Sequence, residues 1–422
     1  MPSRRGFVRM SAGAAVLAAG APAIARARPR VVIVGGGVGG LSVLRALSGD
    51  DRRRVDVTLI EPSTTYTTCF YSNLYYGGFR SLEVLQHGYR QVAGLAGVRV
   101  VHQAATAVDR ERRRVRLADG ADVPYDRLVL SPGIALDYDS VPGWSREAAD
   151  VMPHAWKAGP QSVLLKRQLD AVPDGGLIVM IAPPDPYRCP PGPYERVSMM
   201  AHALTASGRR NARIVILDPK RNFSKQPLFQ QGWEAHYPGM IEWLPPMIHA
   251  GVSRVEPETM TVETGFETYR GADLVNVIPR QTAGRVAVEA GLADDTGYCP
   301  VAATSMRSRH DDAIFVLGDA AVGGDMPKSA FSANSQAAVA AAAVIEDLLD
   351  RPAPPARFRN KCWSLIAGED SVYVGGRYEP RDGRITQVAS EISALEDDAA
   401  TRRTNYADSA AWYLGLTSAL FG

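Results

Sequence analysis

Short runs of apolar residues recur along the chain and predict buried parallel strands. Residues 31–34 are four apolar residues in succession, which is long enough for one such strand. Residues 41–47 then repeat apolar positions at helical spacing, and residues 55–60 are again rich in β-branched and apolar side chains. Strand, helix and strand in this order, within about thirty residues, predict a βαβ unit.

The same pattern continues beyond this unit and indicates an α/β protein. Residues 115–117, followed by Asp119 and Gly120, predict one arm of a hairpin, and the alanine-rich residues 334–349 predict a long helix. Further strands are predicted at residues 98–102, 125–130, 177–181, 213–218 and 313–317.

We therefore expect two Rossmann-like three-layer domains and a small C-terminal α+β domain. The first domain is expected to be discontinuous, at residues 28–142 and 283–351, with the second domain between its parts at residues 143–282. A proline-rich segment begins at Arg351 and marks a linker into the last domain, at residues 352–422. A chain of 422 residues is long for one hydrophobic core, which agrees with two or three domains.

A glycine-rich turn joins the first predicted strand to the first predicted helix. Gly35 lets the chain turn tightly, Gly37 lets backbone amides approach a pyrophosphate, and Gly40 lets the helix pack closely on the sheet. The helix N-terminus also presents unpaired N–H groups and a positive dipole end to the phosphates. Glu61 ends the second strand, where a carboxylate accepts hydrogen bonds from ribose hydroxyls. These residues predict an adenine-dinucleotide site.

The second domain lacks such a turn. After the strand at residues 177–181, the chain continues with prolines at the positions where two-domain flavin reductases carry a second glycine motif for NAD(P)H. Proline has no N–H to offer a phosphate, and its φ is fixed, so the usual amide cradle cannot form. We expect no NAD(P)H to bind here.

Composition and charge exclude several other classes of function. A net charge of +2 gives no domain-wide basic excess, which argues against nucleic-acid binding. The four cysteines form no Cys-x-x-Cys pair, and the seven histidines show no metal-ligand spacing. A metal site is therefore not expected, and a covalent haem on this chain is not expected either.

The N-terminus predicts export. Residues 3–9 contain a twin-arginine pattern, residues 10–24 are weakly apolar, and residues 25–27 offer a small-residue cleavage site. An uncleaved membrane anchor is the alternative, but this segment is short and poor in large apolar residues. We expect residues 1–27 to be a signal peptide and the mature chain to work in the periplasm, with no integral membrane segment.

Two later segments resemble flavoproteins of the glutathione-reductase type. Residues 125–133 are similar to the segment through which those proteins leave their first domain. Residues 313–319 resemble the second FAD motif, in which Asp319 would bind the ribityl chain. The helix that follows would point its N-terminus at the flavin, where a positive dipole end stabilises a reduced, anionic isoalloxazine.

Several motifs together resemble the flavoprotein subunit of flavocytochrome c sulfide dehydrogenase. They lie at residues 67–69, at 154–159, at 188–196 with the order Arg-Cys-Pro-Pro-Gly-Pro-Tyr-Glu-Arg, and at 326–336. The resemblance covers essentially the whole mature chain. It implies FAD held covalently through Cys69, and a redox-active disulfide beside the isoalloxazine that matches Cys189 and Cys362.

Some assignments stay open at this point. Cys299 is left over as an expected core thiol, but spacing alone does not exclude it as the partner of Cys189. Glu195 follows Cys189 in the same loop and is either a proton acceptor near the disulfide or a surface or salt-bridged carboxylate. Lys328 either lies close to the flavin or simply precedes the helix. The apolar residues 410–421 form either a docked terminal segment or an interfacial membrane helix.

The resemblance implies FAD-dependent oxidation of sulfide to a persulfide, polysulfide or sulfur, with single electrons passed to a c-type haem. Because this chain has no haem-attachment motif, the haem must lie on a partner, most simply a cytochrome subunit in a heterodimer. Two alternatives are a sulfide:quinone oxidoreductase and a non-catalytic flavoprotein that assists a sulfur-oxidising complex.

Overall fold

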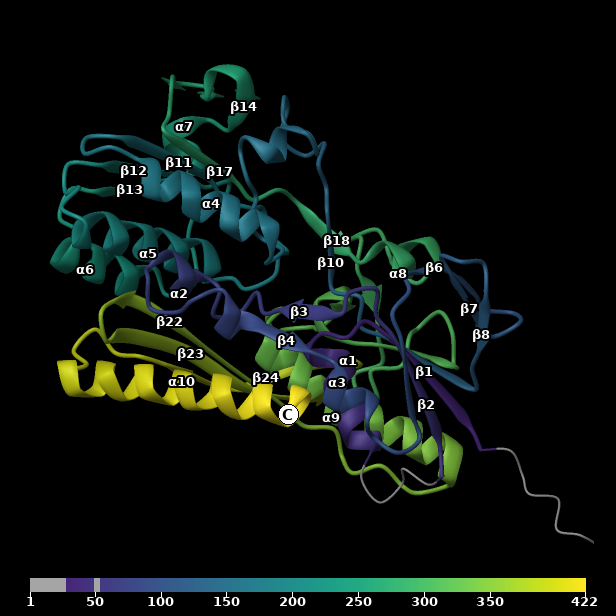
Figure 1. The fold of residues 1–422 in the computed structure, drawn as a ribbon. Coiled ribbons are helices and arrows are strands. Elements are labelled where there is room, and N and C mark those ends of the chain that lie inside the picture. The colour runs from purple at the N-terminus through teal and green to yellow at the C-terminus, as the bar shows by residue number, and fades with distance from the viewer. Residues whose placement is uncertain (1–27, 49–53) are drawn as a thin grey trace, which may run out of the picture.

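The computed structural model describes residues 28–48 and 54–422 and shows an α/β protein, which confirms the predicted fold class (Figure 1). The predicted signal peptide, residues 1–27, lies outside the described residues.

The first domain is organised around a five-stranded sheet in which each neighbouring pair is parallel. The sheet confirms the strands expected from the apolar runs, because these runs supply side chains that are buried within it. In sheet order its strands are β20 (Ile314–Val316), β9 (Arg127–Leu130), β1 (Arg30–Val34), β2 (Asp56–Ile60) and β5 (Val98–Val101).

Helices α1 (Val38–Leu47) and α9 (Ala330–Leu349) pack against each other beside this sheet. Helix α9 begins four residues earlier than the sequence predicts. Ser329 explains the difference, because its Oγ accepts a 3.0 Å hydrogen bond from the N–H of Ser332 and so caps the helix.

The second domain has a four-stranded parallel sheet. Its strands are, in order, β13 (Ile241–Leu244), β12 (Arg213–Leu217), β11 (Leu177–Ile181) and β17 (Leu274–Val277), and its main helices are α4 (Pro160–Ala171), α5 (Gly192–Ala206) and α6 (Gln226–His236). The chain enters and leaves this domain beside an antiparallel pair, β10 (Ile134–Leu136) and β18 (Gln281–Ala283).

The C-terminal part is an antiparallel sheet covered by one long helix. Strands β22 (Phe358–Ala367), β23 (Asp370–Arg381) and β24 (Arg384–Ile392) follow one another, and α10 (Ala399–Phe421) packs on β23. Strand β22 also contacts α5, α6 and α9, so this sheet lies where all three parts of the chain meet (Figure 1).

Shorter elements complete the fold. The predicted hairpin is present as β7 (Arg114–Leu117) and β8 (Asp122–Pro124), paired antiparallel. The other short strands are β3 (Thr65–Thr67), β4 (Gln86–Gly88), β6 (Ala105–Asp109), β14 (Val252–Glu256), β15 (Thr261–Thr264), β16 (Thr268–Tyr269), β19 (Cys299–Pro300) and β21 (Ala321–Val322). The short helices are α2 (Asn73–Tyr76), α3 (Arg90–Ala93), α7 (Pro246–His249) and α8 (Arg285–Glu289), with 3₁₀ turns η2 (Glu83–Leu85), η3 (Ala148–Asp150), η4 (Pro257–Thr259) and η5 (Gly318–Ala320).

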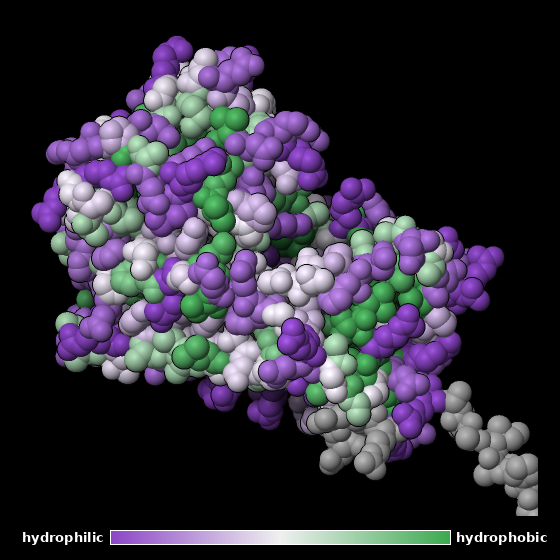
Figure 2. Space-filling model, in the orientation of Figure 1, coloured by the Kyte–Doolittle hydropathy of each residue, from purple (hydrophilic) through white to green (hydrophobic). Residues whose placement is uncertain are grey.

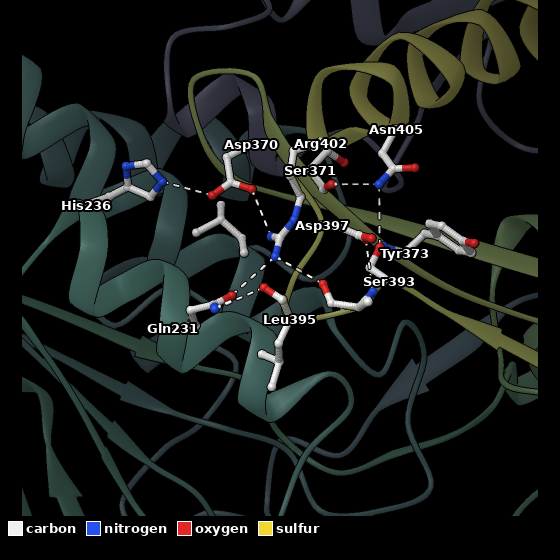
Figure 3. A network of polar contacts seen from close by, with 12 residues as sticks. Gln231, His236, Asp370, Ser371, Tyr373, Ser393, Leu395, Asp397, Arg402 and Asn405 are labelled. Atoms are coloured by element: carbon white, nitrogen blue, oxygen red, sulfur yellow. Dashed lines mark hydrogen bonds and ion pairs between the residues drawn. The ribbon is translucent and has the colours of Figure 1, made fainter. Parts of the chain in front are cut away.

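The C-terminal helix is docked along its whole length. Near its end, the Tyr413 hydroxyl donates a 3.0 Å hydrogen bond to the carbonyl of Val84. Near its start, buried Arg402 forms a 3.0 Å ion pair with Asp370, which also contacts His236 of α6 at 2.9 Å (Figure 3). Of the two predicted arrangements for residues 410–421, the structure therefore has the docked one.

The visible surface is mostly hydrophilic, with hydrophobic residues scattered in small groups (Figure 2). Among the residues that the structure describes, no helix is both long enough and apolar enough to cross a membrane.

Candidate functional site

The glycine turn after β1 has the geometry that a dinucleotide cradle needs. Gly35 has a φ of 102°, and a Cβ there would collide with the carbonyl of Ser131. A Cβ on Gly40 would collide with the carbonyl of Gly35, so glycine is required for α1 to pack this close to the turn. Gly37 is the N-cap of α1 and makes no side-chain cap, which leaves the first amides of α1 for a ligand.

Glu61 lies directly beside this turn. Its carboxylate accepts a 2.8 Å hydrogen bond from the N–H of Gly36 and a 2.9 Å hydrogen bond from the N–H of Ser63. These two bonds hold the side chain at the end of β2 and leave lone pairs for ribose hydroxyls.

A long cavity of about 500 Å³ runs from the glycine turn toward the second domain. We call it the dinucleotide cavity. Its lining includes Gly35, Gly37 and Glu61 at one end and residues of η5 and the α9 N-terminus at the other, among them Asp319. The residues present therefore fit an adenine dinucleotide flavin, whose pyrophosphate would lie at α1.

A second, smaller cavity of about 100 Å³ contains the cysteines. We call it the cysteine cavity. Its walls carry Cys69, Cys189, Cys362 and Glu195, together with several aromatic rings. The two cavities share five lining residues and therefore meet there: Cys69, Phe70, Arg188, Ser329 and Ala330. Cys69, for which the resemblance implies a covalent link to FAD, thus lies at the junction of the two cavities.

Cys189 is held by the backbone of its loop. Its φ of 58° is in the left-handed region, and its N–H donates a 2.7 Å hydrogen bond to the carbonyl of Lys328. Its own carbonyl accepts a 2.8 Å hydrogen bond from the N–H of Gly192, where α5 begins. Burial raises the pKa of the Cys189 thiol well above its usual value, and the nearby Cys362 and Glu195 raise it further.

Cys362 lies within β22 and faces the same cavity. Its Sγ donates to Asn360 Oδ1 at 3.5 Å. The structure describes all four cysteines, and all four are free thiols, so the predicted Cys189–Cys362 disulfide is not formed here. Cys299 is fully buried in the core of the first domain and lines neither cavity. The pairing of Cys189 with Cys362 stays a prediction.

Glu195 is the carboxylate of the cysteine cavity rather than a surface group. It accepts a 2.8 Å hydrogen bond from Asn73 Nδ2 and a 2.9 Å hydrogen bond from the N–H of Leu365. Burial raises the pKa of this carboxyl group, whereas both hydrogen bonds lower it. The sequence analysis did not single out Asn73, which is the first residue of α2, shortly after Cys69 in the chain.

Lys328 does not line either cavity among the described residues. Its Nζ donates to the carbonyls of Asp319 and Ala321 at 3.0 and 2.6 Å and lies 3.7 Å from the ring centre of Tyr298. Burial lowers its pKa to about 8. Of the two predicted positions, the structure favours the one in which Lys328 supports the loop before α9.

Two buried cations and one partly buried cation lie near the cysteines, and the sequence analysis gave none of them this place. Arg188 lies 3.6 Å from Asp319 and lines both cavities. Arg196 is 2% exposed and donates to backbone carbonyls and to Asn276. Lys225 donates to the carbonyl of Cys362 and to Ser364 Oγ. Arg188 and Arg196 lie in the same 188–196 motif as Cys189, which is the signal that could have found them, whereas Lys225 reaches the site from a distant part of the sequence.

The second domain lacks a glycine turn at the end of β11, as its prolines predict. The Lys220 ammonium occupies part of this region, where it donates a 2.6 Å hydrogen bond to the carbonyl of Pro183 and pairs with Asp218 at 2.7 Å. Within the described residues, no group of histidine, cysteine and carboxylate side chains could hold a metal ion.

Three family models match successive parts of the chain. Residues 29–157 match the pyridine nucleotide-disulphide oxidoreductases. Residues 162–279 match the central part of the flavoprotein chain of sulfide dehydrogenase (flavocytochrome c). Residues 354–421 match the flavin-binding part of flavocytochrome c sulphide dehydrogenase.

Individual relatives agree with these models. Mitochondrial sulfide:quinone oxidoreductase from Dictyostelium discoideum is 25% identical over 341 residues, which cover 76% of this chain and 72% of that protein. The solved structure of sulfide:quinone oxidoreductase from Aquifex aeolicus shares the fold, with a TM-score of 0.71 at 17% identity over 93% of this chain and 92% of that one.

The flavoprotein chain of sulfide dehydrogenase (flavocytochrome c) from Chlorobaculum thiosulfatiphilum is 50% identical over 44 residues, which are 10% of this chain and 90% of that sequence. Two of the three family models describe the same flavoprotein. Together with a cavity lined by the glycine turn that meets a cavity of cysteines, these matches show that the chain belongs to the flavoprotein family of flavocytochrome c sulfide dehydrogenase.

Proposed function

We propose that this protein oxidises sulfide with FAD and a cysteine disulfide and passes electrons to a c-type haem on a partner subunit. The observation that carries the proposal is the junction of the two cavities, where Cys69, Cys189 and Cys362 line one small space beside the dinucleotide cavity.

The charges around this space favour an anionic substrate. Arg196 and Lys225 are buried cations near the cysteines, Arg188 is a partly buried one, and Glu195 is the carboxylate among them. Their combined positive charge, in a site largely removed from water, attracts hydrosulfide, which is the main form of sulfide near neutral pH.

Hydrosulfide can open a Cys189–Cys362 disulfide by thiol–disulfide exchange. A bond forms between the sulfide sulfur and one cysteine, the disulfide bond breaks, and the other cysteine leaves as a thiolate. Each oxygen of Glu195 accepts one hydrogen bond and keeps a lone pair, so this carboxylate can take the proton of the persulfide. FAD, when bound, supplies the acceptor for the electron pair and can pass electrons on singly.

We further propose a covalent link between FAD and Cys69, because Cys69 lies where the two cavities meet. The twin-arginine pattern supports work in the periplasm, where a disulfide persists and where c-type cytochromes are available. We also propose a heterodimer with a cytochrome subunit, which the family assignment supports.

The electron acceptor decides between the proposal and its nearest rival. The purified holoprotein is reduced with sulfide under anaerobic conditions, and flavin absorbance is followed after addition of cytochrome c or of decylubiquinone. The proposal expects rapid reoxidation by cytochrome c and little by the quinone. Reoxidation by the quinone alone would assign a sulfide:quinone oxidoreductase, and no bleaching by sulfide would leave a non-catalytic flavoprotein.

A further inference from the structure

Lys225 is a buried lysine at the start of a helix. It is the N-cap of α6 and adopts a left-handed conformation with a φ of 62°, yet it is only 4% exposed. Within the part of the chain that the structure describes, no carboxylate lies at ion-pair distance from its ammonium group. Burial of an unpaired ammonium group costs desolvation free energy. We therefore expect this charge to have a functional role.

The ammonium group of Lys225 reaches from the second domain to the C-terminal sheet. Its Nζ donates a 3.1 Å hydrogen bond to the carbonyl of Cys362 and a 2.8 Å hydrogen bond to Ser364 Oγ, both in β22. Its stem passes the ring of Phe229, whose centre is 5.8 Å from Nζ. The charge is therefore fixed against the backbone of the residue that carries the reactive sulfur.

We propose that Lys225 is a positioning residue of the cysteine cavity, and that its ammonium group is the counter-charge for the thiolate that Cys362 forms when the Cys189–Cys362 disulfide opens. This inference rests on the proposed function. In the exchange step one S–S bond forms, another breaks, and one negative charge moves from hydrosulfide to a cysteine sulfur. A fixed cation stabilises that charge without taking part in the bond changes.

The charged groups that face Lys225 agree with this role. Burial lowers its pKa to about 8, whereas Cys362, Glu195 and Cys189 raise it. In return, burial raises the pKa of the Cys362 thiol, Lys225 lowers this pKa more than the hydrogen bonds with Asn360 and Ser329 do, and Glu195 raises it.

The other two cations are directed elsewhere. Arg188 contacts Asp319 and lowers the pKa of the Cys189 thiol, and Arg196 donates to Asn73 Oδ1 and to the carbonyl of His154. Lys361 also lines the cavity, but its ammonium lies over the rings of Trp363 and Tyr373. We therefore assign the action on Cys362 to Lys225. Its stabilisation of the thiolate is present below pH 8, where the lysine is charged, and is lost as the pH rises through its pKa.

Alkylation of the reduced holoprotein tests this proposal without any turnover. The protein is reduced, freed of reductant and exposed to iodoacetamide between pH 6 and 10, and mass spectrometry follows the peptide that contains Cys362. Because only the thiolate reacts, the dependence of the rate on pH reports the titration of Cys362. Lys225→Met should shift this titration upward by at least about one unit, which lowers the rate at pH 7 about tenfold.

Two further variants sharpen the result. Lys225→Arg keeps the charge and should react within about twofold of the unmodified protein, which a purely electrostatic role requires. Lys361 is the residue before Cys362, and its ammonium lies over the rings of Trp363 and Tyr373. Lys361→Met removes this ammonium and should leave the titration of Cys362 unchanged. If Lys225→Met does not fold, Lys225→Gln keeps an N–H donor without the charge and replaces it.

An unchanged Cys362 titration in the neutral variant, Lys225→Met or its replacement Lys225→Gln, would overturn the proposal. An equal shift of the Cys362 titration in Lys361→Met would also overturn it, because the loss of any nearby positive charge would then have the same effect. Failure of the proposed function is seen separately: sulfide would not bleach the flavin of the unmodified protein, whatever the alkylation profile of its variants.

Discussion

The N–H of Cys189 donates a hydrogen bond of 2.7 Å to the carbonyl of Lys328, and this bond joins the cysteine loop of the second domain to the segment that leads into α9. Ser329, the next residue, caps α9 and lines both cavities. The position of the Cys189 sulfur is thus set relative to the N-terminus of the helix that faces the dinucleotide cavity. Because this hydrogen bond joins two backbone groups, no side-chain substitution at Lys328 removes it directly.

Replacing Cys69 with serine should release the flavin. The thiol lies at the junction of the cavities, where a thioether to FAD would form, and serine offers no equivalent sulfur. Acid-precipitated unmodified protein should keep its yellow colour in the pellet, whereas Cys69→Ser should lose it to the supernatant. Free FAD released from the unmodified protein would contradict a covalent link.

Cys189→Ser and Cys362→Ser should each abolish flavin reduction by sulfide while leaving FAD bound, because each removes one sulfur of the exchange reaction. Stopped-flow absorbance measures the reduction. Cys299→Ser is the matched control: Cys299 is fully buried in the first domain, so its replacement should affect stability more than turnover. A peptide map that links Cys189 to Cys299 would refute the predicted pairing.

NADH and NADPH should leave the flavin oxidised. The loop after β11 presents prolines in place of glycine amides, and the Lys220 ammonium is bound to the carbonyl of Pro183 in this region. Anaerobic mixing with either nucleotide should leave flavin absorbance unchanged over minutes, with sulfide as the positive control. Rapid bleaching by NADH would show a nucleotide site that the sequence does not reveal.

The sequence predicted the parallel sheets well because their strands are continuous apolar runs, as in β1 and β11, and it placed the glycine turn and Glu61 because those motifs are local. It did not predict the three long strands of the C-terminal sheet, where residues such as Cys362 and Ser364 alternate with apolar ones and the runs are broken. It also missed Lys225 and Arg196. Their contacts join residues more than forty positions apart in the chain, so local residue spacing does not predict these contacts.

Acid should destabilise the fold through His154. This side chain is 4% exposed, and its Nδ1 accepts a 2.9 Å hydrogen bond from the N–H of Trp156, which requires a neutral ring. Burial, and then the neighbouring Arg196, lower its pKa to about 3, whereas the unfolded chain titrates near 6.5. The unfolded state therefore binds more protons below pH 6.5, and stability is lost as the pH falls from 6.5 toward 3.

His154→Asn tests this explanation, because the asparagine Oδ1 can accept the same hydrogen bond but does not titrate. Between pH 6 and 4, the unmodified protein should lose up to about 1.4 kcal/mol more per pH unit than the variant. Urea unfolding at a series of pH values measures the difference. Equal slopes in the two proteins would assign the acid sensitivity to other groups.

Arg402 should stabilise the docking of α10 onto the rest of the molecule. Its guanidinium pairs with Asp370 at 3.0 Å and donates to Gln231 Oε1 of α6 at 3.3 Å, so it links the last helix to β23 and to the second domain (Figure 3). Arg402→Met keeps the length of the stem but leaves the partly buried Asp370 with His236 alone, which should lower the free energy of unfolding by about 1–3 kcal/mol.

The neighbouring Arg403 is the control for this change. It is exposed on the same turn of α10, and Arg403→Met should alter the free energy of unfolding by no more than about 0.5 kcal/mol. Because α10 also carries Trp412 into the cysteine cavity, hydrogen exchange in Arg402→Met should increase along α10 before it increases in the core of the first domain. Equal stability of the two variants would show that the hydrogen bonds of Tyr413, at the far end of the helix, hold α10 without the Arg402–Asp370 pair.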